Sequence, residues 1–95
     1  MIVGICKLRL DLPHLHSLKE KRQLLQRIKQ KGMDRFKILI AEVEDQDLWQ
    51  SAVLGLALVA GDENFVRDRI QKILSFIEES EGLRIGDESI EVFHY

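Results

Sequence analysis

Four polar side chains recur at spacings of three and four residues within the segment 18–31. They are Lys19, Arg22, Gln26 and Lys29, named together the cationic stripe. On an α-helix, residues at these spacings share one face. A stripe of this kind is typical of a surface that contacts the phosphates of a nucleic acid. It is equally what the solvated face of an ordinary helix looks like. Arg27 extends the charge around the same predicted helix.

The stripe belongs to a strongly basic part of a chain whose net charge is only −2. Residues 1–37 hold ten of the fourteen Lys and Arg but three of the sixteen Asp and Glu, a balance of +7. Residues 38–95 hold four Lys and Arg against thirteen acids, a balance of −9. Cations outside the helix that add to the basic part are Lys7, Arg9, Arg35 and Lys37. Phosphate contact through the stripe is therefore a leading hypothesis.

Lys21 lies on the apolar side of the same predicted helix, three residues after Leu18 and four before Leu25. A buried ammonium group without a partner costs several kcal/mol, so this side chain must reach the edge of the core or meet an acid. Glu42 interrupts the otherwise apolar run 38–43 and is the partner that the pattern indicates. We predict a structural Lys21–Glu42 ion pair, with a functional site around the lysine as the alternative.

The segment before the helix holds His14 and His16, two residues apart. Two histidines and a carboxylate can bind a metal, but no further His or Cys array accompanies them, and we predict no metal and no cofactor. A small anion held by the amides of the helix N-terminus, beside His16 and Ser17, is a further functional hypothesis. The single Cys6 lies in an apolar alternation that favours an inert buried thiol. We predict no catalytic residue and no enzymatic activity.

A second polar cluster follows residue 44. Its members are Gln46, Asp47, Trp49 and Gln50. A tryptophan buries a large apolar area, so we predict that Leu48 and Trp49 close the end of the core while Asp47 caps a turn. The alternative is that the polar members surround an exposed edge of Trp49 and form a partner-docking surface.

Periodicity defines the elements that position these residues. Apolar side chains alternate from residue 2 to 11, which indicates a strand with one buried face. Pro13 interrupts that pattern. Ser17 and Glu20 match a capping box, so a helix should begin near Leu18, run to Lys31 and end at Gly32 in the left-handed conformation.

The rest of the chain repeats this alternation of strand and helix. Strands are predicted at about 35–43 and 50–60, and a helix from Gly61-Asp62 to Gly82. The apolar stripe of that helix recurs at helical spacing: Val66, Ile70, Ile73 and Ile77. A last strand, bulged at Gly86-Asp87, is predicted to end at Phe93.

The predicted order is therefore β-α-β-β-α-β within one domain, residues 1–95. The compact fold that fits this order is an α+β ferredoxin-like sandwich, in which a four-stranded antiparallel sheet carries two helices on one face. Right-handed crossovers require the strand order 4-1-3-2. No apolar run is long enough to span a membrane and no signal-peptide pattern is present, so we expect a cytoplasmic protein.

The predicted third strand has no polar residue from Ala52 to Ala60. Because helices cover only one face of the sheet, we expect a partner on the other face, and a homodimer is the simplest cover. Aromatic residues that could stack bases are absent from the two central strands, and only Phe93 and Tyr95 could form a small platform.

Two segments carry a resemblance to a known family. They are residues 16–22, HSLKEKR, and residues 41–50, AEVEDQDLWQ, accompanied by Leu54-Gly55. In combination they resemble the YlxP-like family, small bacterial proteins classed as a domain of unknown function. The resemblance implies a ferredoxin-like fold. Genes of this family often neighbour those of transcription elongation, translation initiation and ribosome maturation, which implies an RNA- or ribosome-linked role without known catalytic residues. The chain lacks the basic residue expected after Gln50, which argues against a phosphate contact there.

The sequence thus favours a non-catalytic accessory factor that binds RNA or the ribosome through its basic first helix. A homodimer without nucleic-acid binding is the alternative.

Overall fold

A computed structural model describes every residue from Met1 to Tyr95. Seven elements follow one another along the chain: β1 (Ile2–Asp11), α1 (Leu18–Lys31), a short π-helix (Gly32–Phe36), β2 (Leu39–Glu44), β3 (Ser51–Ala60), α2 (Glu63–Ser80) and β4 (Arg84–His94). The predicted β-α-β-β-α-β order is confirmed, with the π-helix as an addition to it.

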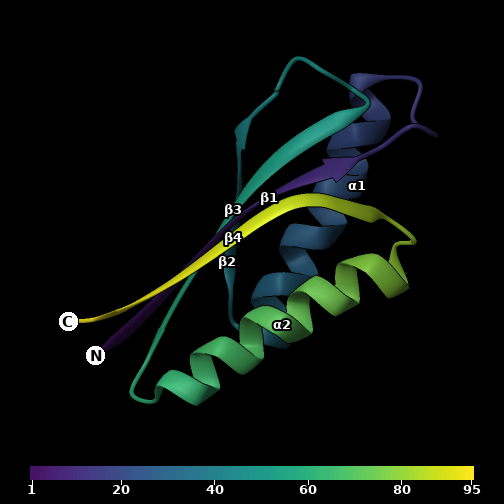
Figure 1. Cartoon of the computed structure of the whole chain (residues 1–95). Helices are drawn as coiled ribbons and strands as arrows, with labels where there is room; N and C mark the ends of the chain where they lie inside the picture. The colour runs from purple at the N-terminus through teal and green to yellow at the C-terminus, as the bar shows by residue number, and fades with distance from the viewer.

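The four strands form one antiparallel sheet in the order β2-β3-β1-β4. Read from its other edge, this is the predicted order 4-1-3-2. Both helices lie against the same face of the sheet, and the two termini lie side by side at one end of the central strands (Figure 1). The ferredoxin-like fold is therefore confirmed.

The core lies between the sheet and the helices, as the alternation in β1 predicts. Ile2, Gly4, Cys6, Leu8 and Leu10 are buried, whereas the residues that alternate with them are wholly or partly exposed. The predicted apolar stripe of α2 meets them and is fully buried: Val66, Ile70, Ile73 and Ile77. A Cβ atom at Gly4 would lie 2.3 Å from Val66 Cγ1, so the missing side chain lets α2 approach β1 closely.

The start of α1 is fixed by the predicted capping box. Ser17 Oγ accepts a hydrogen bond from the amide of Glu20 at 3.1 Å, and the Glu20 carboxylate accepts one from the amide of His16 at 3.2 Å. These contacts satisfy two amides that would otherwise lack partners. The helix extends to Lys31, as predicted.

The prediction of Gly32 as a left-handed helix end was wrong. Gly32 keeps a right-handed helical conformation, and the chain continues as a π-helix to Phe36. A Cβ atom at residue 32 would lie 2.5 Å from Ile40 Cδ1, so a close approach to β2 is what requires the glycine. The left-handed residue is Lys37, at φ 58°, whose amide donates to the carbonyl of Gly32.

The π-helix also moves the start of β2. The predicted strand 35–43 is observed at 39–44, since the first two of its residues belong to the π-helix. Phe36 is buried there against Phe76 of α2, with ring centroids 5.6 Å apart. The strand was predicted from the Ile, Leu and Val residues that follow, and packing of Phe36 against α2 keeps the start of that segment helical.

Two further glycines occur where the sequence predicts a helix end and a strand bulge. Gly82 has φ 63° and follows the end of α2, as predicted. Opposite Arg9, the β1–β4 pairing shifts by one residue, and Gly86 and Asp87 are the two β4 residues that face it. The predicted bulge is therefore confirmed.

Candidate functional site

The cationic stripe lies on the outer side of α1, away from the core. Lys19, Arg22 and Gln26 are exposed and Lys29 is half-buried. None of the three cations has an acidic oxygen within 4.0 Å. A shallow polar hollow adjoins the stripe and is lined by Arg22, Gln23, Gln26, Arg27 and Gln30. The outer face of α1 thus presents unneutralised cations with amide groups between them.

Arg27 differs from the stripe because it has a partner. Its Nε lies 3.4 Å from a carboxylate oxygen of Glu81, which follows α2. Arg35 lies over the rings of Phe36 and Phe76 at 5.5 and 5.8 Å from their centroids. These two guanidinium groups therefore contribute to packing between the helices. Free positive charge is concentrated on the stripe itself and on Lys31 and Lys37 at the end of the helix.

Lys21 is almost fully buried, and the structure brings it together with Glu42. Lys21 Nζ lies 2.6 Å from Glu42 Oε2, at an angle outside hydrogen-bond geometry, so the contact is an ion pair. The ammonium group donates hydrogen bonds to the carbonyls of Asp45, at 2.6 Å, and Leu48, at 2.5 Å. Lys21 therefore joins α1 to the connection between β2 and β3. Because its charge is neutralised and two of its three donors are hydrogen-bonded inside the protein, the contacts describe a structural role.

Residues 45–50, named the 45–50 loop, do not form the predicted plug. The Trp49 side chain is 46% exposed and Leu48 is 53% exposed, and neither belongs to the core. The core closes without them because Leu12, Leu15 and Leu83 occupy its edges. The prediction that the two residues bury themselves was wrong, since it weighed their apolar area and not the space available.

The 45–50 loop is held in place from several sides. Ser51 Oγ donates to the Asp45 carboxylate at 2.9 Å, and the amide of Leu48 donates to the Asp45 carbonyl at 3.0 Å. The Gln50 side chain donates to the carbonyls of Pro13 and Leu15, both at 3.3 Å. Of the predicted docking residues, Gln50 is thus an anchor, whereas the side chains of Gln46, Asp47 and Trp49 are exposed and make no hydrogen bond within the chain.

Sequence reasoning missed the hydrogen bonds of Lys21 to this loop. The signal for them was present: a lysine within an apolar arc has three donors, and one carboxylate cannot satisfy all of them. Backbone carbonyls from an adjacent loop are the other common acceptors. The exposure of Leu48 was not predicted either, because no pattern in the sequence distinguishes it from a buried leucine.

The predicted anion site before α1 is partly occupied by the carboxylate of Glu20. His14 and His16 are exposed, and Glu20 accepts from the His16 amide at the helix N-terminus. A small anion entering beside Ser17 has to displace or accommodate this negative charge. Nowhere in the structure do three or more His, Cys, Asp or Glu side chains gather as they would around a metal ion.

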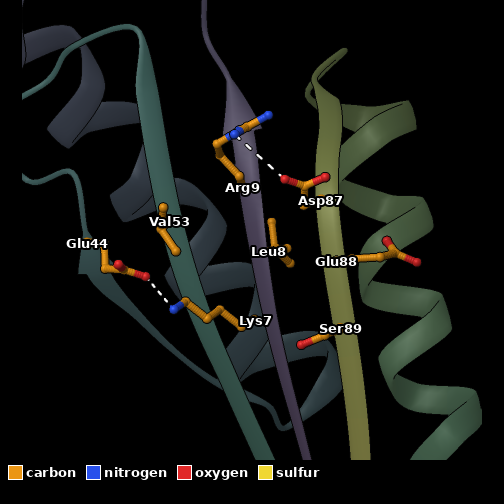
Figure 2. Close-up of a pocket in the computed structure, with 8 residues that line it drawn as sticks. All are labelled: Lys7, Leu8, Arg9, Glu44, Val53, Asp87, Glu88 and Ser89. Atoms are coloured by element: carbon orange, nitrogen blue, oxygen red, sulfur yellow. Dashed lines mark ion pairs between the residues drawn. The ribbon is translucent and has the colours of Figure 1, made fainter.

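The outer sheet face, which the helices leave uncovered, also carries cations, but these have partners. Lys7 forms an ion pair with Glu44. Arg9 lies 3.7 Å from both Asp11 and Asp87 and extends across β4, where Gly86 leaves room for its guanidinium group. Figure 2 shows the Lys7–Glu44 and Arg9–Asp87 pairs reaching from the central strand β1 toward both edges.

The remainder of the outer sheet face is apolar and uncovered. Its exposed large side chains are Ile5, Leu39, Val43, Val59 and Phe93. Gly55 and Ala57 lie between them on β3, and a hollow opens above these two small residues. The face is therefore divided into an apolar half near the termini and a charged half near Arg9.

Cys6 faces the core. Burial, with a smaller effect from the negative charge of Glu88, raises the pKa of its thiol to about 11. The thiol is therefore protonated at neutral pH and is a poor nucleophile.

Comparison with known proteins gives the family. The model of a family described as a protein of unknown function, DUF503, matches residues 3–90. The chain belongs to this family. It is also similar to the uncharacterized protein YlxP of Bacillus subtilis, with 31% identity over 77 residues, covering 81% of this chain and 84% of YlxP. The resemblance drawn from residues 16–22 and 41–50 is thereby confirmed.

Solved structures show the fold alone. The designed protein Foldit4 aligns at a TM-score of 0.57 with 11% identity, covering 99% of this chain and 97% of its own. A variant of SnoaB, a cofactor-independent oxygenase from Streptomyces nogalater, aligns at 0.54 with 12% identity over 99% and 92%. A putative antibiotic biosynthesis monooxygenase from Deinococcus radiodurans aligns at 0.52 with 16% identity over 100% and 92%. Within the DUF503 chain, neither helix has the length and apolar character needed to cross a membrane.

Proposed function

We propose that this DUF503 protein is a non-catalytic accessory factor that binds RNA, free or in the ribosome, through the cationic stripe of α1. The observation that carries the proposal is the absence of any acidic partner for Lys19, Arg22 and Lys29. On the outer sheet face, by contrast, the exposed cations Lys7 and Arg9 are paired.

The physical basis is the release of counterions from phosphates. A lysine or arginine already paired with a carboxylate gains little from a phosphate, whereas a free one gains a full charge-assisted contact. From Lys19 to Lys29 the stripe extends about 15 Å along the helix axis. Gln26 between them adds amide donors that suit phosphate and ribose oxygens. The convex helix surface fits a groove or a backbone strand better than it fits a small ligand.

Binding to ribosomal RNA across a salt series tests this proposal. With three or four phosphate contacts on a duplex, log affinity should fall with log salt at a slope of about −3. Changing Lys19, Arg22 and Lys29 together to Glu should abolish binding at 50 mM salt. Absence of binding by the unaltered protein, or unchanged binding by the triple variant, would falsify the proposal.

We propose, as a second function, self-association through the outer sheet face. The specific observation is its apolar half, where Leu39 is 60% and Val59 62% exposed. An apolar surface of this size left in water is unfavourable, and contact with another protein removes it from water. The occupant that the geometry favours is a second copy of the chain.

The register of β1 and β3 supports a second copy of the chain as the partner on this face. Ile5 pairs with Ala57 and Lys7 with Gly55, so bulky and small residues lie at the same level of one sheet. A two-fold axis parallel to the strands and midway between β1 and β3 brings β1 of one copy over β3 of the other at that level. Each Ile5 then enters the hollow above Ala57 of the second copy, and the apolar halves meet.

The outer sheet face as a whole is large enough for such a dimer. Four strands of six to eleven residues, about 4.8 Å apart and with about 3.3 Å per residue, give the whole face a flat footprint of about 600 Å². A stable interface buries about 800 Å² of accessible surface on each partner. A corrugated sheet surface exposes more area than its footprint, so the two values are comparable.

Sedimentation equilibrium tests the dimer. The unaltered chain should have twice the 11.0 kDa mass of one copy, and the double variant Ile5→Lys/Val59→Lys should have the mass of one. Because the contact is apolar, 500 mM salt should leave the dimer intact, whereas pairing between the basic and acidic parts of the chain would weaken. A monomer at micromolar concentration would contradict this second function.

A further inference from the structure

The 45–50 loop displays the chain's single tryptophan to solvent although the core is complete without it. Trp49 is 46% exposed and adjoins Leu48, which is 53% exposed. A hollow is lined by the residues from Asp47 to Ser51 around the indole ring. An indole is among the most costly side chains to leave in water. Nothing in the packing of the fold requires an indole at this position.

The position of this indole is nevertheless fixed by buried contacts. The ammonium group of Lys21 donates to carbonyls on both sides of the loop, those of Asp45 and Leu48, while Glu42 neutralises its charge. On the other side, Gln50 is bonded to the carbonyls of Pro13 and Leu15. A loop held this firmly loses little conformational entropy when a ligand binds to it.

The same contacts join the loop to α1, the helix that carries the cationic stripe. Lys21, which holds the loop from the core side of α1, is in the same turn as Lys19 and Arg22, whose side chains are exposed. The 45–50 loop and the start of α1 lie at the same end of the molecule (Figure 1). An RNA strand whose phosphates contact the first turns of α1 therefore passes close to the exposed ring.

We propose that Trp49 is a stacking site for an unpaired nucleobase of RNA bound by the stripe. The inference rests on the proposed RNA-binding function and adds the class of ligand, a single-stranded or bulged nucleotide. Base–aromatic stacking contributes about 1–3 kcal/mol per base and tolerates any sequence. Gln46 and Asp47 expose an amide and a carboxylate on the same loop, groups that can hydrogen-bond base edges.

Charge and chemistry favour a base over an apolar protein segment at this site. The start of α1, which carries the free cations Lys19 and Arg22, lies at the same end of the molecule as the loop (Figure 1), and these cations attract a polyanion. An apolar peptide would gain nothing from those cations. A base offers a π face to the indole while its phosphates reach Lys19 and Arg22.

The intrinsic fluorescence of Trp49 tests the proposal directly, because no other tryptophan contributes to it. The probes are an RNA hairpin with a uridine loop, a blunt RNA duplex of equal length and inorganic polyphosphate. The hairpin should quench the fluorescence on binding, since a stacked base quenches an indole. The duplex and polyphosphate should bind through the stripe with little quenching.

Substitutions give a second measurement. Trp49→Leu should weaken hairpin binding by about 5- to 100-fold and leave polyphosphate binding unchanged. Trp49→Phe should retain most of the affinity, because a phenyl ring still stacks. The matched control is Phe65→Leu, an equally exposed aromatic residue on α2, which should have no effect.

The outcomes separate this inference from the function on which it rests. Hairpin binding without quenching, together with normal affinity of Trp49→Leu, overturns the stacking site and leaves the stripe intact. Failure of the unaltered protein to bind any of the three probes overturns the RNA-binding function itself.

Discussion

The outer face of α1 and the outer face of the sheet both carry cations, yet the two surfaces differ in how those cations are neutralised. On α1, Lys19, Arg22 and Lys29 have no acidic partner. On the sheet, Lys7 pairs with Glu44, and Arg9 lies near Asp11 and Asp87 (Figure 2). The sheet pairs adjoin an apolar half of the same face, whereas the hollow beside the stripe is lined by polar side chains alone.

The difference shows that a count of charges does not describe a binding surface. The +7 of residues 1–37 divides among free cations, paired surface cations and the buried Lys21. Only a cation without an acidic partner contributes fully to the affinity for RNA, because it neutralises a phosphate and releases its counterion without first breaking an ion pair. Paired cations on an apolar sheet face fit a protein interface, where charges are matched and water is excluded.

The largest expected effect concerns a cation of α1 that has partners. Lys21→Met should lower the free energy of unfolding by about 3–5 kcal/mol, because it leaves Glu42 uncompensated and removes the ammonium donor from the carbonyls of Asp45 and Leu48, of which Asp45 keeps the amide of Leu48. Lys19→Met, on the same helix without partners, should change it by less than about 0.5 kcal/mol. Urea denaturation of both variants measures the contrast, and equal stabilities would remove the structural role assigned to Lys21.

The second prediction compares equal losses of charge on the two surfaces. Lys19→Gln/Arg22→Gln should weaken RNA binding by about 10- to 100-fold, or about 1.4–2.8 kcal/mol, and should lower the salt slope by about 2. Lys7→Gln/Arg9→Gln should change affinity by less than about twofold, since those cations are already paired. Filter binding with one RNA hairpin measures both, and equal losses would mean that overall charge alone attracts RNA.

The third prediction concerns a variant whose outer sheet face is more apolar. Lys7→Met/Glu44→Leu should tighten self-association by about tenfold, because dimerisation no longer removes an ion pair from water. The matched control, Lys72→Met/Asp68→Leu, removes an equally exposed pair from α2 and should have no effect. Sedimentation velocity gives both dissociation constants. Weaker association of the first variant would contradict this and show that the Lys7–Glu44 pair stabilises the dimer.

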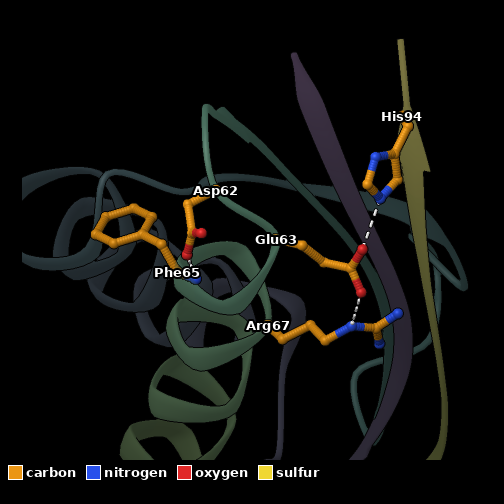
Figure 3. Close-up of polar contacts among 5 residues, drawn as sticks. All are labelled: Asp62, Glu63, Phe65, Arg67 and His94. Carbon is orange, nitrogen blue, oxygen red and sulfur yellow. Dashed lines mark hydrogen bonds and ion pairs between the residues drawn. The ribbon is translucent and has the colours of Figure 1, made fainter.

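The smallest expected effect involves neither surface. At the start of α2, Glu63 Oε1 lies 2.6 Å from His94 Nε2. Glu63 Oε2 accepts a hydrogen bond from Arg67 Nε at 2.9 Å (Figure 3). The bond to His94, and then that to Arg67, lowers the pKa of the Glu63 carboxyl. Its contribution to stability is therefore present above the ordinary carboxyl pKa and is lost as pH falls through the lowered value.

The corresponding experiment compares thermal unfolding at pH 7 and at acidic pH. The unaltered chain should lose slightly more stability on acidification than Glu63→Gln, which has no carboxyl to protonate. The difference should be small, because the group is exposed and solvent screens its contacts. An identical pH response in the two proteins would show that Glu63 adds no measurable stability.

Much of the fold was predictable because local patterns and packing agree. The alternation in β1 and the capping box at Ser17 fix the first two elements, and right-handed crossovers leave one strand order. Residues 32–38 were not predictable from local pattern. Gly32 is required there by contact with Ile40, a residue of a different element. Only the assembled structure shows that a glycine serves packing and not a turn.

The candidate site was predictable to a similar extent. Helical spacing was enough to place the stripe and to put Lys21 on the apolar side of α1, and the single acid in the apolar run 38–43 identified Glu42 as its partner. It could not show which cations remain free, because Glu81 and Asp87 come from distant parts of the chain. The exposure of Trp49 was predicted wrongly, since an apolar residue is buried only where the surrounding elements leave space.

The meeting of the two chain ends has a practical consequence. The terminal ammonium group of Met1 donates to the Tyr95 carbonyl at 3.0 Å, and the Tyr95 amide donates to the Met1 carbonyl at 2.8 Å. A short peptide could therefore join the ends and yield a circularly permuted chain with new ends at Gly61, between β3 and α2. In the natural order, a tag at either end lies about 30 Å along β1 from the 45–50 loop. Immobilisation through such a tag leaves that loop and the start of α1 facing away from the support.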